Sequence, residues 1–405
     1  RQSAGLNAGT GDTPYLFFSR RIGLDGVRTV PLRAGARLTG KVGKYNLGVL
    51  NVETGRVSAG SIEPANFTVL RVKRDILRRS ALGAMYTHRT ATPGQPGSND
   101  GFGLDSTLAF YQNLRIDSYL AATQSDGLSG QNLSYRGLVD YNGDRYGLQA
   151  ERLVVQKNFN PAVGFVRRPD LRRNYGLARF SPRPKGIPHV RKLTWQGSLG
   201  YFTNNQNRLD TREVNGQFLT EFTNSDVAVF SYTDNFERLV VPFAIATGIR
   251  LPVGGYNFHT TKLEYQAGQQ RKTSGTVTWE TGTFYNGDRQ SIAVSSGRTQ
   301  VSPQLSIEPS LQVNWVNLVQ GSFTARVYRS RVSYTMTPRM FVSGILQYNS
   351  AGTSVGSNLR FRWEYRPGSE LFVVYTDDYD TDANAGVDAL RNRAVVVKIN
   401  RLFRP

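Results

Sequence analysis

Apolar and polar residues alternate along much of this chain. From Leu305 to Trp315 every odd-numbered residue is apolar, and every even-numbered one is Ser, Glu, Gln or Asn. Successive side chains of a β-strand point to opposite faces of the sheet, so this segment should have one apolar and one polar face. The alternation recurs between turn signals, and no helical period competes with it. This pattern predicts an all-β chain that closes into a barrel.

Turn signals divide the chain into about 22 expected strands, with a range of roughly 20–24. Short turns are expected at Gly43-Lys44, Asn142-Gly143-Asp144, Asn224-Ser225-Asp226, Thr337-Pro338 and Pro367-Gly368-Ser369. Longer connections are expected at residues 90–101, 157–172, 237–255 and 377–388. Short turns on one rim and long loops on the other are typical of outer-membrane barrels. The expected strands lie near residues 14–22, 33–42, 45–54, 66–75, 79–89, 104–113, 116–125, 132–141, 144–156, 173–182, 190–203, 212–223, 226–236, 256–268, 273–286, 290–301, 304–316, 322–336, 339–348, 355–366, 370–377 and 391–403.

The composition fits a barrel with a polar lumen. Only 39% of the 405 residues are hydrophobic and the mean hydropathy is -0.40, although the chain has 20 Tyr, 21 Phe and 4 Trp. The longest apolar stretch, Leu239 to Ile249, is interrupted by Pro242 and Gly248 and is too short for a membrane helix. Closed barrels also span membranes, and only their outward face must be apolar. We expect a lead-in at residues 1–13 and one transmembrane antiparallel barrel domain at residues 14–403.

Several strands show which side chains would face lipid. Leu193, Trp195, Leu199 and Tyr201 share one phase, and all four Trp of the chain lie on such apolar phases. We expect Trp195, Trp279, Trp315 and Trp363 to form an aromatic girdle at the membrane interface. The alternative is that these rings face the core of a sandwich, which would need a second apolar-faced sheet and far fewer strands.

Several stretches resemble an uncharacterised family of outer-membrane β-barrels. They are residues 15–24, 34–52, 251–258 and 361–376, and the region from the first stretch to the last spans most of the chain. Members of this family usually carry a carbohydrate-binding, family 9-like domain before the barrel, so the resemblance implies the barrel part alone. The last expected strand ends at Phe403, which resembles the C-terminal aromatic signal of outer-membrane barrels, although Arg404 and Pro405 follow it. The chain begins at Arg1 without a signal-peptide core, so we expect a mature protein or a fragment.

Enzymatic chemistry finds little support in the sequence. There is no Cys, and the three His, at positions 88, 189 and 259, are scattered, so neither a zinc site nor a catalytic triad is indicated. A catalytic pair of carboxylates, as in glycoside hydrolases, is an open alternative. Glu280, Glu308 and Glu364 lie on polar phases, however, and are more simply explained as lumen residues. We therefore expect no enzyme and no cofactor.

An acidic stretch near the C-terminus is a weak metal candidate. Asp378, Asp380 and Asp382 offer alternating oxygen ligands for calcium, but the Gly and Glu of an EF-hand loop are missing. A solvated acidic loop explains the same residues, and it is the interpretation that we favour.

The formal charge of +20 requires a different explanation. Nucleic-acid binders concentrate Lys and Arg on one face or in a tail, whereas here they are spread over the chain, so no nucleic acid is expected. Basic residues on polar phases would instead point into the lumen and select anions. The alternative is that these basic residues form ion pairs with Glu280, Glu308 and Glu364 and thereby stabilise the barrel wall. The lumen and anion-binding candidates are Arg37, Lys41, Arg136, Lys192, Arg326, Arg360, Arg362 and Lys398.

These expectations combine into one functional hypothesis. The chain would be an integral β-barrel of a Gram-negative outer membrane, in contact with lipid and lipopolysaccharide, acting as a channel or transporter for saccharides or anionic solutes. Residues 157–172 and 237–255 are the best candidates to fold inward and narrow the passage. The alternatives are a non-conducting barrel that anchors periplasmic or envelope partners, and a soluble sugar-binding β protein.

Overall fold

The computed structural model describes residues 11–403, apart from residue 27 and residues 58–61, 91–96 and 382–389. Within these residues every regular element is a strand except one short 3-10 helix, and no helix has the length and apolar character needed to cross a membrane. The elements are η1 (Ser19–Arg21), β1 (Leu24–Asp25), β2 (Arg28–Thr29), β3 (Leu32–Val42), β4 (Tyr45–Thr54), β5 (Asn66–Leu77), β6 (Ser80–Arg89), β7 (Asn99–Phe110), β8 (Leu114–Ser125), β9 (Leu133–Asn142), β10 (Tyr146–Val155), β11 (Leu171–Phe180), β12 (Val190–Thr203), β13 (Leu209–Phe222), β14 (Val227–Leu239), β15 (Phe243–Ala246), β16 (Ile249–Leu251), β17 (Gly254–Ala267), β18 (Thr273–Phe284), β19 (Gly287–Gln300), β20 (Leu305–Leu318), β21 (Gly321–Thr337), β22 (Met340–Asn349), β23 (Ser354–Arg366), β24 (Ser369–Asp380) and β25 (Leu390–Asn400).

Twenty-one of the described strands belong to one antiparallel sheet. Strands that follow one another along the chain are neighbours from β3 to β14 and from β17 to β25, and β14 pairs with β17. The all-β antiparallel class and the strand number are therefore confirmed. Meander connections of this kind allow each strand to pair with the one before it through a short turn.

The expected strand at residues 14–22 is wrong. Tyr15 forms an isolated bridge with Phe165, and Ser19–Arg21 is a 3-10 helix. Four consecutive apolar residues, Tyr15 to Phe18, mark the segment as buried but do not alternate as a sheet strand with one wet face would. This segment instead packs against the sheet through Leu16.

The chain divides into two compact units, each described by itself. Unit 1 contains Arg1–Phe180 and Gly197–Glu213, and unit 2 contains Ser181–Gln196 and Val214–Pro405. The alternation of the sequence predicts one domain over residues 14–403. In the structure the boundary passes through β12 and β13, so each unit receives part of both strands.

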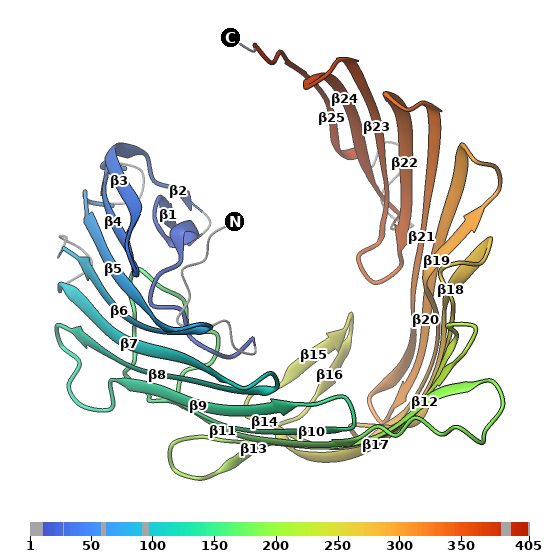
Figure 1. Ribbon diagram of the computed structural model, residues 1–405, viewed down its shortest axis with the longest axis horizontal. Helices are drawn as coiled ribbons and strands as arrows, with labels where there is room; N and C mark the ends of the chain where they lie inside the picture. Colours follow the sequence, from blue (N-terminus) through green and yellow to red (C-terminus); the bar gives the residue numbers. More distant parts are fainter. Residues whose placement is uncertain (1–10, 27, 58–61, 91–96, 382–389, 404–405) are drawn as a thin grey trace. The chain divides into compact units, whose positions relative to one another are not determined.

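Strand register gives unit 1 two distinct faces. Arg136 of β9 lies opposite Tyr119 of β8 and Leu153 of β10, and residues directly opposite each other share a face. We call the face of β5–β11 that carries Arg71, Asp105, Arg136 and Glu151 its ionic face. The opposite face, its apolar face, carries large exposed residues such as Phe102 and Leu104. Figure 1 shows the N-terminal segment with β1 and β2 lying off the sheet beside β3–β6.

Unit 2 repeats the division into two faces. Its ionic face carries Glu280, Glu308, Arg331 and Arg362, and its apolar face carries Trp279, Trp315 and Trp363. The hairpin β15–β16 leaves the sheet between β14 and β17 (Figure 1). Ile249 and Leu251 of this hairpin are buried against Val316 and Leu318, which lie on the ionic face. The long connection at residues 237–255 thus folds onto the ionic face, as expected.

The connections of unit 1 differ in length between the two ends of its strands. Only residues 43–44, 78–79, 111–113 and 143–145 separate β3 from β4, β5 from β6, β7 from β8 and β9 from β10. The connections at the other end cover residues 55–65, 90–98, 126–132 and 156–170. Unit 1 therefore has the expected short-turn rim and long-loop rim.

A buried carboxylate in a short turn of unit 2 should make that turn acid-sensitive. Asp226 is 2% exposed and accepts hydrogen bonds from Tyr265 Oη (2.6 Å) and the Gly268 backbone N–H (2.8 Å). These bonds, and the Arg271 guanidinium, hold the pKa of Asp226 below its ordinary value. A lowered pKa in the folded state means that the stabilisation is complete above the ordinary pKa and is lost as pH falls through the lowered one.

We predict that Asp226→Asn removes this acid-dependent part of stability. Unfolding followed by tryptophan fluorescence against pH should show a smaller loss for the variant than for the parent below about pH 4. Asp75→Asn, at the short-turn rim of unit 1, is the control, because the ion pair of Asp75 with Lys41 is exposed, and it should change the acid profile less. Identical acid profiles for Asp226→Asn and the parent would contradict the prediction.

Candidate functional site

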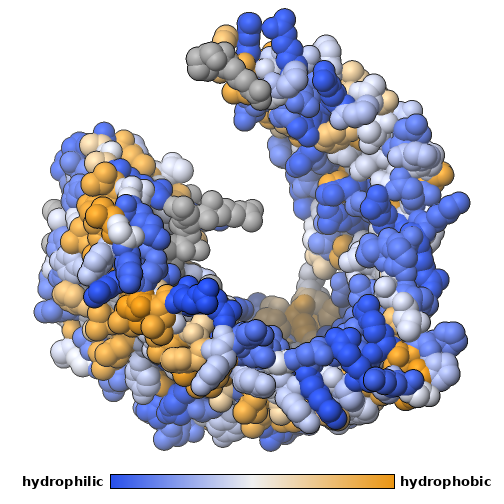
Figure 2. Space-filling view, in the orientation of Figure 1, coloured by the Kyte–Doolittle hydropathy of each residue, from blue (hydrophilic) through white to orange (hydrophobic). Residues whose placement is uncertain are grey.

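The apolar faces expose large side chains to the surroundings. Trp195, Trp279, Trp315 and Trp363 are 45%, 40%, 44% and 41% exposed, and Trp279 lies between Leu263 and Ile292 on neighbouring strands. Figure 2 shows hydrophobic residues gathered over β7, β8 and β9. All four Trp thus lie where the alternation places them. Their role as an interfacial girdle stays a prediction.

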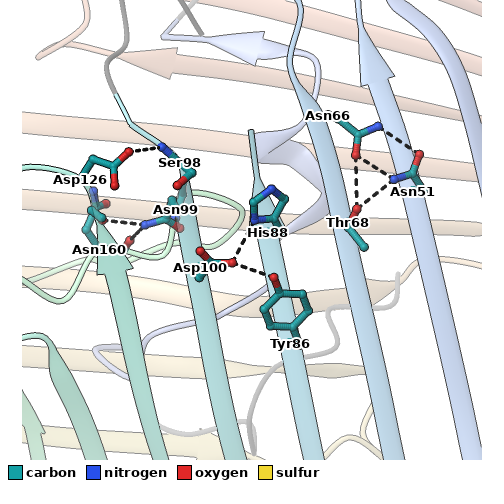
Figure 3. Close-up of polar contacts among 12 residues, drawn as sticks. Asn51, Asn66, Thr68, Tyr86, His88, Ser98, Asn99, Asp100, Asp126 and Asn160 are labelled. Carbon is teal, nitrogen blue, oxygen red and sulfur yellow. Dashed lines mark hydrogen bonds and ion pairs between the residues drawn. The ribbon is translucent and has the colours of Figure 1, made fainter. Parts of the chain in front are cut away.

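Tyr86 shows how such a face ends at the long-loop rim of unit 1. Its ring packs against Phe102 at 5.2 Å, while its hydroxyl donates to Asp100 Oδ1 at 2.7 Å. Nδ1 of His88 lies 2.9 Å from the same oxygen (Figure 3). An apolar ring with its polar tip turned to hydrogen-bonding partners is typical of an interfacial residue.

A buried ion triad lies on the ionic face of unit 1. Oε1 of Glu151 accepts from Arg136 Nε at 2.7 Å, and its Oε2 lies 3.2 Å from Nη1 of Arg173. The side chains of Glu151 and Arg136 are 0% and 3% exposed, and that of Arg173 is 9% exposed. Burial of a single charge here would be very unfavourable, so each of the three depends on the others.

Further ion pairs extend this network across the strands. Arg71 of β5 forms a two-pronged pair with Asp105 of β7, and Nη2 of Arg71 lies 2.9 Å from Oδ1. Arg115 Nε lies 2.8 Å from Asp117 Oδ2 on β8. Each of these carboxylates thus has an arginine partner on the ionic face, and Glu151 has two.

Two segments cover the network. Leu16 of the N-terminal segment and Phe159 of the β10–β11 loop are buried against Met85, Tyr119 and Leu153. The two segments also bind each other, because Tyr15 and Phe165 exchange backbone hydrogen bonds of 2.9 and 2.8 Å. We call residues 13–18 and 156–170 the cover. The β10–β11 loop folds onto the ionic face as expected, whereas the N-terminal segment was expected to be a strand.

Asn99 at the start of β7 holds the cover to the sheet. Its Nδ2 donates to the Asn160 carbonyl oxygen at 2.8 Å, and its Oδ1 accepts from the Ala162 backbone N–H at 2.9 Å. Thr123 of β8 adds a third bond, from the Asn160 N–H to its Oγ1 at 2.9 Å. Figure 3 shows Asn99 and Asn160 facing each other across this contact. Asn99 is 4% exposed, so these bonds are shielded from water.

A hollow of about 330 Å³ lies on the ionic face of unit 2. Its walls include Arg331, Phe341, Arg360, Arg362 and Phe372, which come from β21–β24. Register explains the arrangement, because Arg362 lies directly opposite Phe341 on one side and Phe372 on the other. Its guanidinium carbon is 5.6 and 5.8 Å from the two ring centroids, which is cation–π distance.

Seven of the eight basic candidates lie on the ionic faces, but they are not brought together. Lys41 binds Asp75 at 3.2 Å and Arg136 belongs to the buried triad, whereas Arg360 and Arg362 share the hollow. Lys398 lies opposite Phe372 on β25, beside that hollow. Arg37 lies opposite Leu50 on the ionic face of β3, and Lys192 has the phase of buried Thr194 on β12. Their selection of anions stays a prediction.

The phase expected of Arg326 is wrong. Arg326 lies opposite Val313, which shares its face with Leu311 and Trp315. It is therefore on the apolar face of β21, in phase with Tyr328. The reason is that alternation along residues 321–337 gives even-numbered residues to the apolar face.

The acidic candidates form ion pairs or strand contacts. Glu280 pairs with Arg289 at 3.2 Å, Glu308 lies 3.8 Å from Arg331, and Glu364 accepts from the Gly368 N–H at 2.9 Å. The arginines that pair with Glu280 and Glu308 are thus not among the eight basic candidates.

The weak calcium candidate is not a loop site in the structure. Asp378 and Asp380 lie inside β24, which extends to Asp380, and Asp380 pairs with Arg391 at 2.5 Å. Asp382 lies outside the described residues. Among the described residues no cluster of His, Asp and Glu has metal-binding geometry.

Sequence reasoning missed most of the buried triad and the residue that holds the cover. Glu151 and Arg173 lie in strands whose polar phase was visible, but their pairing depends on register between β9, β10 and β11. The turn residues at 90–101 predict a loop that includes Asn99, although Asn99 begins β7. A signal did exist for Glu151, because it is the one acidic residue among the apolar side chains near the end of β10.

Comparisons with known proteins add little to this geometry. No family model and no curated protein matches the chain. One similar solved structure is the open form of the ferric-catecholate import receptor Fiu of E. coli K12, with 9% sequence identity and a TM-score of 0.43. The alignment covers 91% of this chain and 72% of that one. A likeness at this level assigns no activity or cargo to this chain.

We predict that Glu151→Gln strongly destabilises unit 1. The change leaves two buried arginines without their common carboxylate, which should lower the free energy of unfolding by about 3–5 kcal/mol. Glu221→Gln is the matched control, because Glu221 pairs with Arg191 at 2.9 Å in an exposed setting and should cost at most about 1 kcal/mol. Denaturant unfolding in detergent measures both, and equal losses would contradict the role of the triad.

We also predict that Asn99→Ala loosens the cover without unfolding the sheet. The Ala162 N–H loses its acceptor, so its amide should exchange several-fold faster with deuterium. Asn66→Ala, which removes a bond to Asn51 on the apolar face at the same rim, should leave that exchange unchanged. Unaltered exchange at Ala162 in Asn99→Ala would show that Asn99 does not hold the cover.

Proposed function

We propose that this chain is a membrane-spanning outer-membrane β-barrel that conducts polar solutes along its ionic face. The observation that carries the proposal is the separation of the two faces. Large hydrophobic residues, including all four Trp, lie 40% or more exposed on one face, while ion pairs lie on the other. In water, so many exposed apolar side chains on the apolar face of each unit would be a liability, whereas lipid would cover them.

The charge of the ionic face favours anions as the conducted species. In unit 1, Asp105 and Asp117 each pair with one arginine, and Glu151 pairs with two. In unit 2 the hollow has Arg331, Arg360 and Arg362 on its walls, and the carboxylates near them belong to Glu308 and Glu370. Excess positive charge along a passage attracts anions and repels cations. Saccharide cargo has only the family resemblance in its favour.

A second function follows from the cover. Residues 13–18 and 156–170 fill part of the ionic face of unit 1 with buried apolar side chains, so little space remains there for solute. This favours a non-conducting barrel that anchors periplasmic or envelope partners through its loops. Under either function the protein would be integral to a Gram-negative outer membrane and in contact with lipid and lipopolysaccharide.

Conductance in planar bilayers distinguishes the two. We predict discrete channels with a reversal potential that favours chloride over potassium. The double variant Arg360→Gln, Arg362→Gln should reduce that preference, because it removes two cations from the hollow. The sealed alternative predicts no channels from folded protein, with folding verified by heat-dependent gel mobility.

The control is Arg326→Gln, which removes a charge from the apolar face of the same unit. It should leave ion preference unchanged. Channels whose selectivity responds equally to Arg326→Gln and to the double variant would contradict a passage along the ionic face.

A further inference from the structure

We infer that the hollow on the ionic face of unit 2 is a binding site for small carboxylates that carry an aromatic or similarly flat apolar body. The inference deepens the proposed function, on which it rests only for access of solute to this face. It starts from the chemistry of the walls. Arg331, Arg360 and Arg362 provide donors, while Phe341, Phe372 and Val374 provide apolar surface.

Arg362 is fixed in place and forms a wall of the site. Its guanidinium lies between Phe341 and Phe372, and it is paired with Glu370 of β24. Its Nε is buried and has no hydrogen-bond partner among the described residues. A planar cation held between two rings loses little further freedom when a ligand arrives, so the wall is preorganised.

Arg360 is the residue placed to take the carboxylate. It lies two residues before Arg362 on the same face of β23, opposite Ser343 and Val374. Its Nε donates to Asn358 Oδ1 at 2.9 Å, and Asn358 is itself held by a 2.7 Å bond to Thr376 Oγ1. This anchor orients the fork of the guanidinium but leaves its terminal nitrogens without a carboxylate partner among the described residues. A carboxylate can bind such a fork through both oxygens.

The same walls argue against a neutral sugar. Sugar hydroxyls need hydrogen-bond acceptors as well as donors, and guanidinium groups have none. Glu370 is already engaged by Arg362, so this carboxylate is not free to accept from sugar hydroxyls. Excess cations favour an anion, and the apolar walls favour one with a body larger than that of acetate.

The volume agrees with a ligand of this size. The hollow measures about 330 Å³, which is near the lower end of the range of roughly 300–1,000 Å³ for small-molecule sites. One ring with one carboxylate fits this space, and Lys398 on β25 lies beside Phe372 to add a further positive charge.

Binding of benzoate to the full chain in detergent tests the site directly. Isothermal titration should show benzoate binding several-fold tighter than acetate, and neither glucose nor inorganic phosphate should displace it. Arg360→Gln should weaken benzoate binding by about tenfold, because a charge-assisted bond is lost. Arg360→Lys should recover only part of this loss, since a lysine retains the charge without the fork. Phe372→Leu should weaken benzoate binding and leave acetate binding unchanged.

Arg326→Gln is the matched control, because it removes the same charge from the apolar face of β21 and should bind benzoate like the parent. Acetate or phosphate binding as tightly as benzoate would overturn the inference, as would displacement by glucose or equal effects of Arg360→Gln and Arg326→Gln. Failure of the site is distinct from failure of the proposed function. Benzoate binding without bilayer conductance would leave the site intact and refute the conduit, whereas anion-selective conductance without benzoate binding would do the reverse.

Discussion

Strand register is the constraint on which the other features of this protein depend. Backbone hydrogen bonds between antiparallel neighbours fix which residues lie opposite each other, and a slip of one residue would exchange the two faces. The row from Phe341 through Arg362 and Phe372 to Lys398 exists only because four strands keep one alignment. The same alignment sends Trp363 and Leu371 to the other face. The register of β22–β25 therefore determines both the hollow on the ionic face and the residues of the apolar face.

The two units use their ionic faces in different ways. In unit 1 a carboxylate stands between two arginines, and this triad is buried beside packed apolar residues. In unit 2 Arg362 is braced by two aromatic rings, and it remains partly exposed beside a hollow that Arg331 and Arg360 also line. Buried pairs contribute more to a unique arrangement than to net stability, whereas exposed and oriented cations are suited to ligands. The same residue type therefore has two different roles.

The sequence allowed the fold to be predicted much better than the site. Alternation such as that of Leu305 to Trp315 marks strands because it is local, and nearly every expected strand is present. Residues 14–22 were misinterpreted because a buried run and a strand have similar composition, and the partner, Phe165, is distant in sequence. Arg326 could have been placed correctly from its phase with Tyr328. The pairing of Glu151 with Arg136 and Arg173 could not, because it requires a register that no single strand contains.

The cover also has a consequence for how unit 1 could change shape. Its two segments come from distant parts of the chain, yet Tyr15 and Phe165 bind each other reciprocally, and Phe18 donates to the Val163 carbonyl. Leu16 and Phe159 share one apolar cluster beneath them. Neither segment can leave alone without exposing the apolar contacts of the other. Release of the ionic face is therefore a cooperative, all-or-none event, and a protease cut in either segment would weaken both.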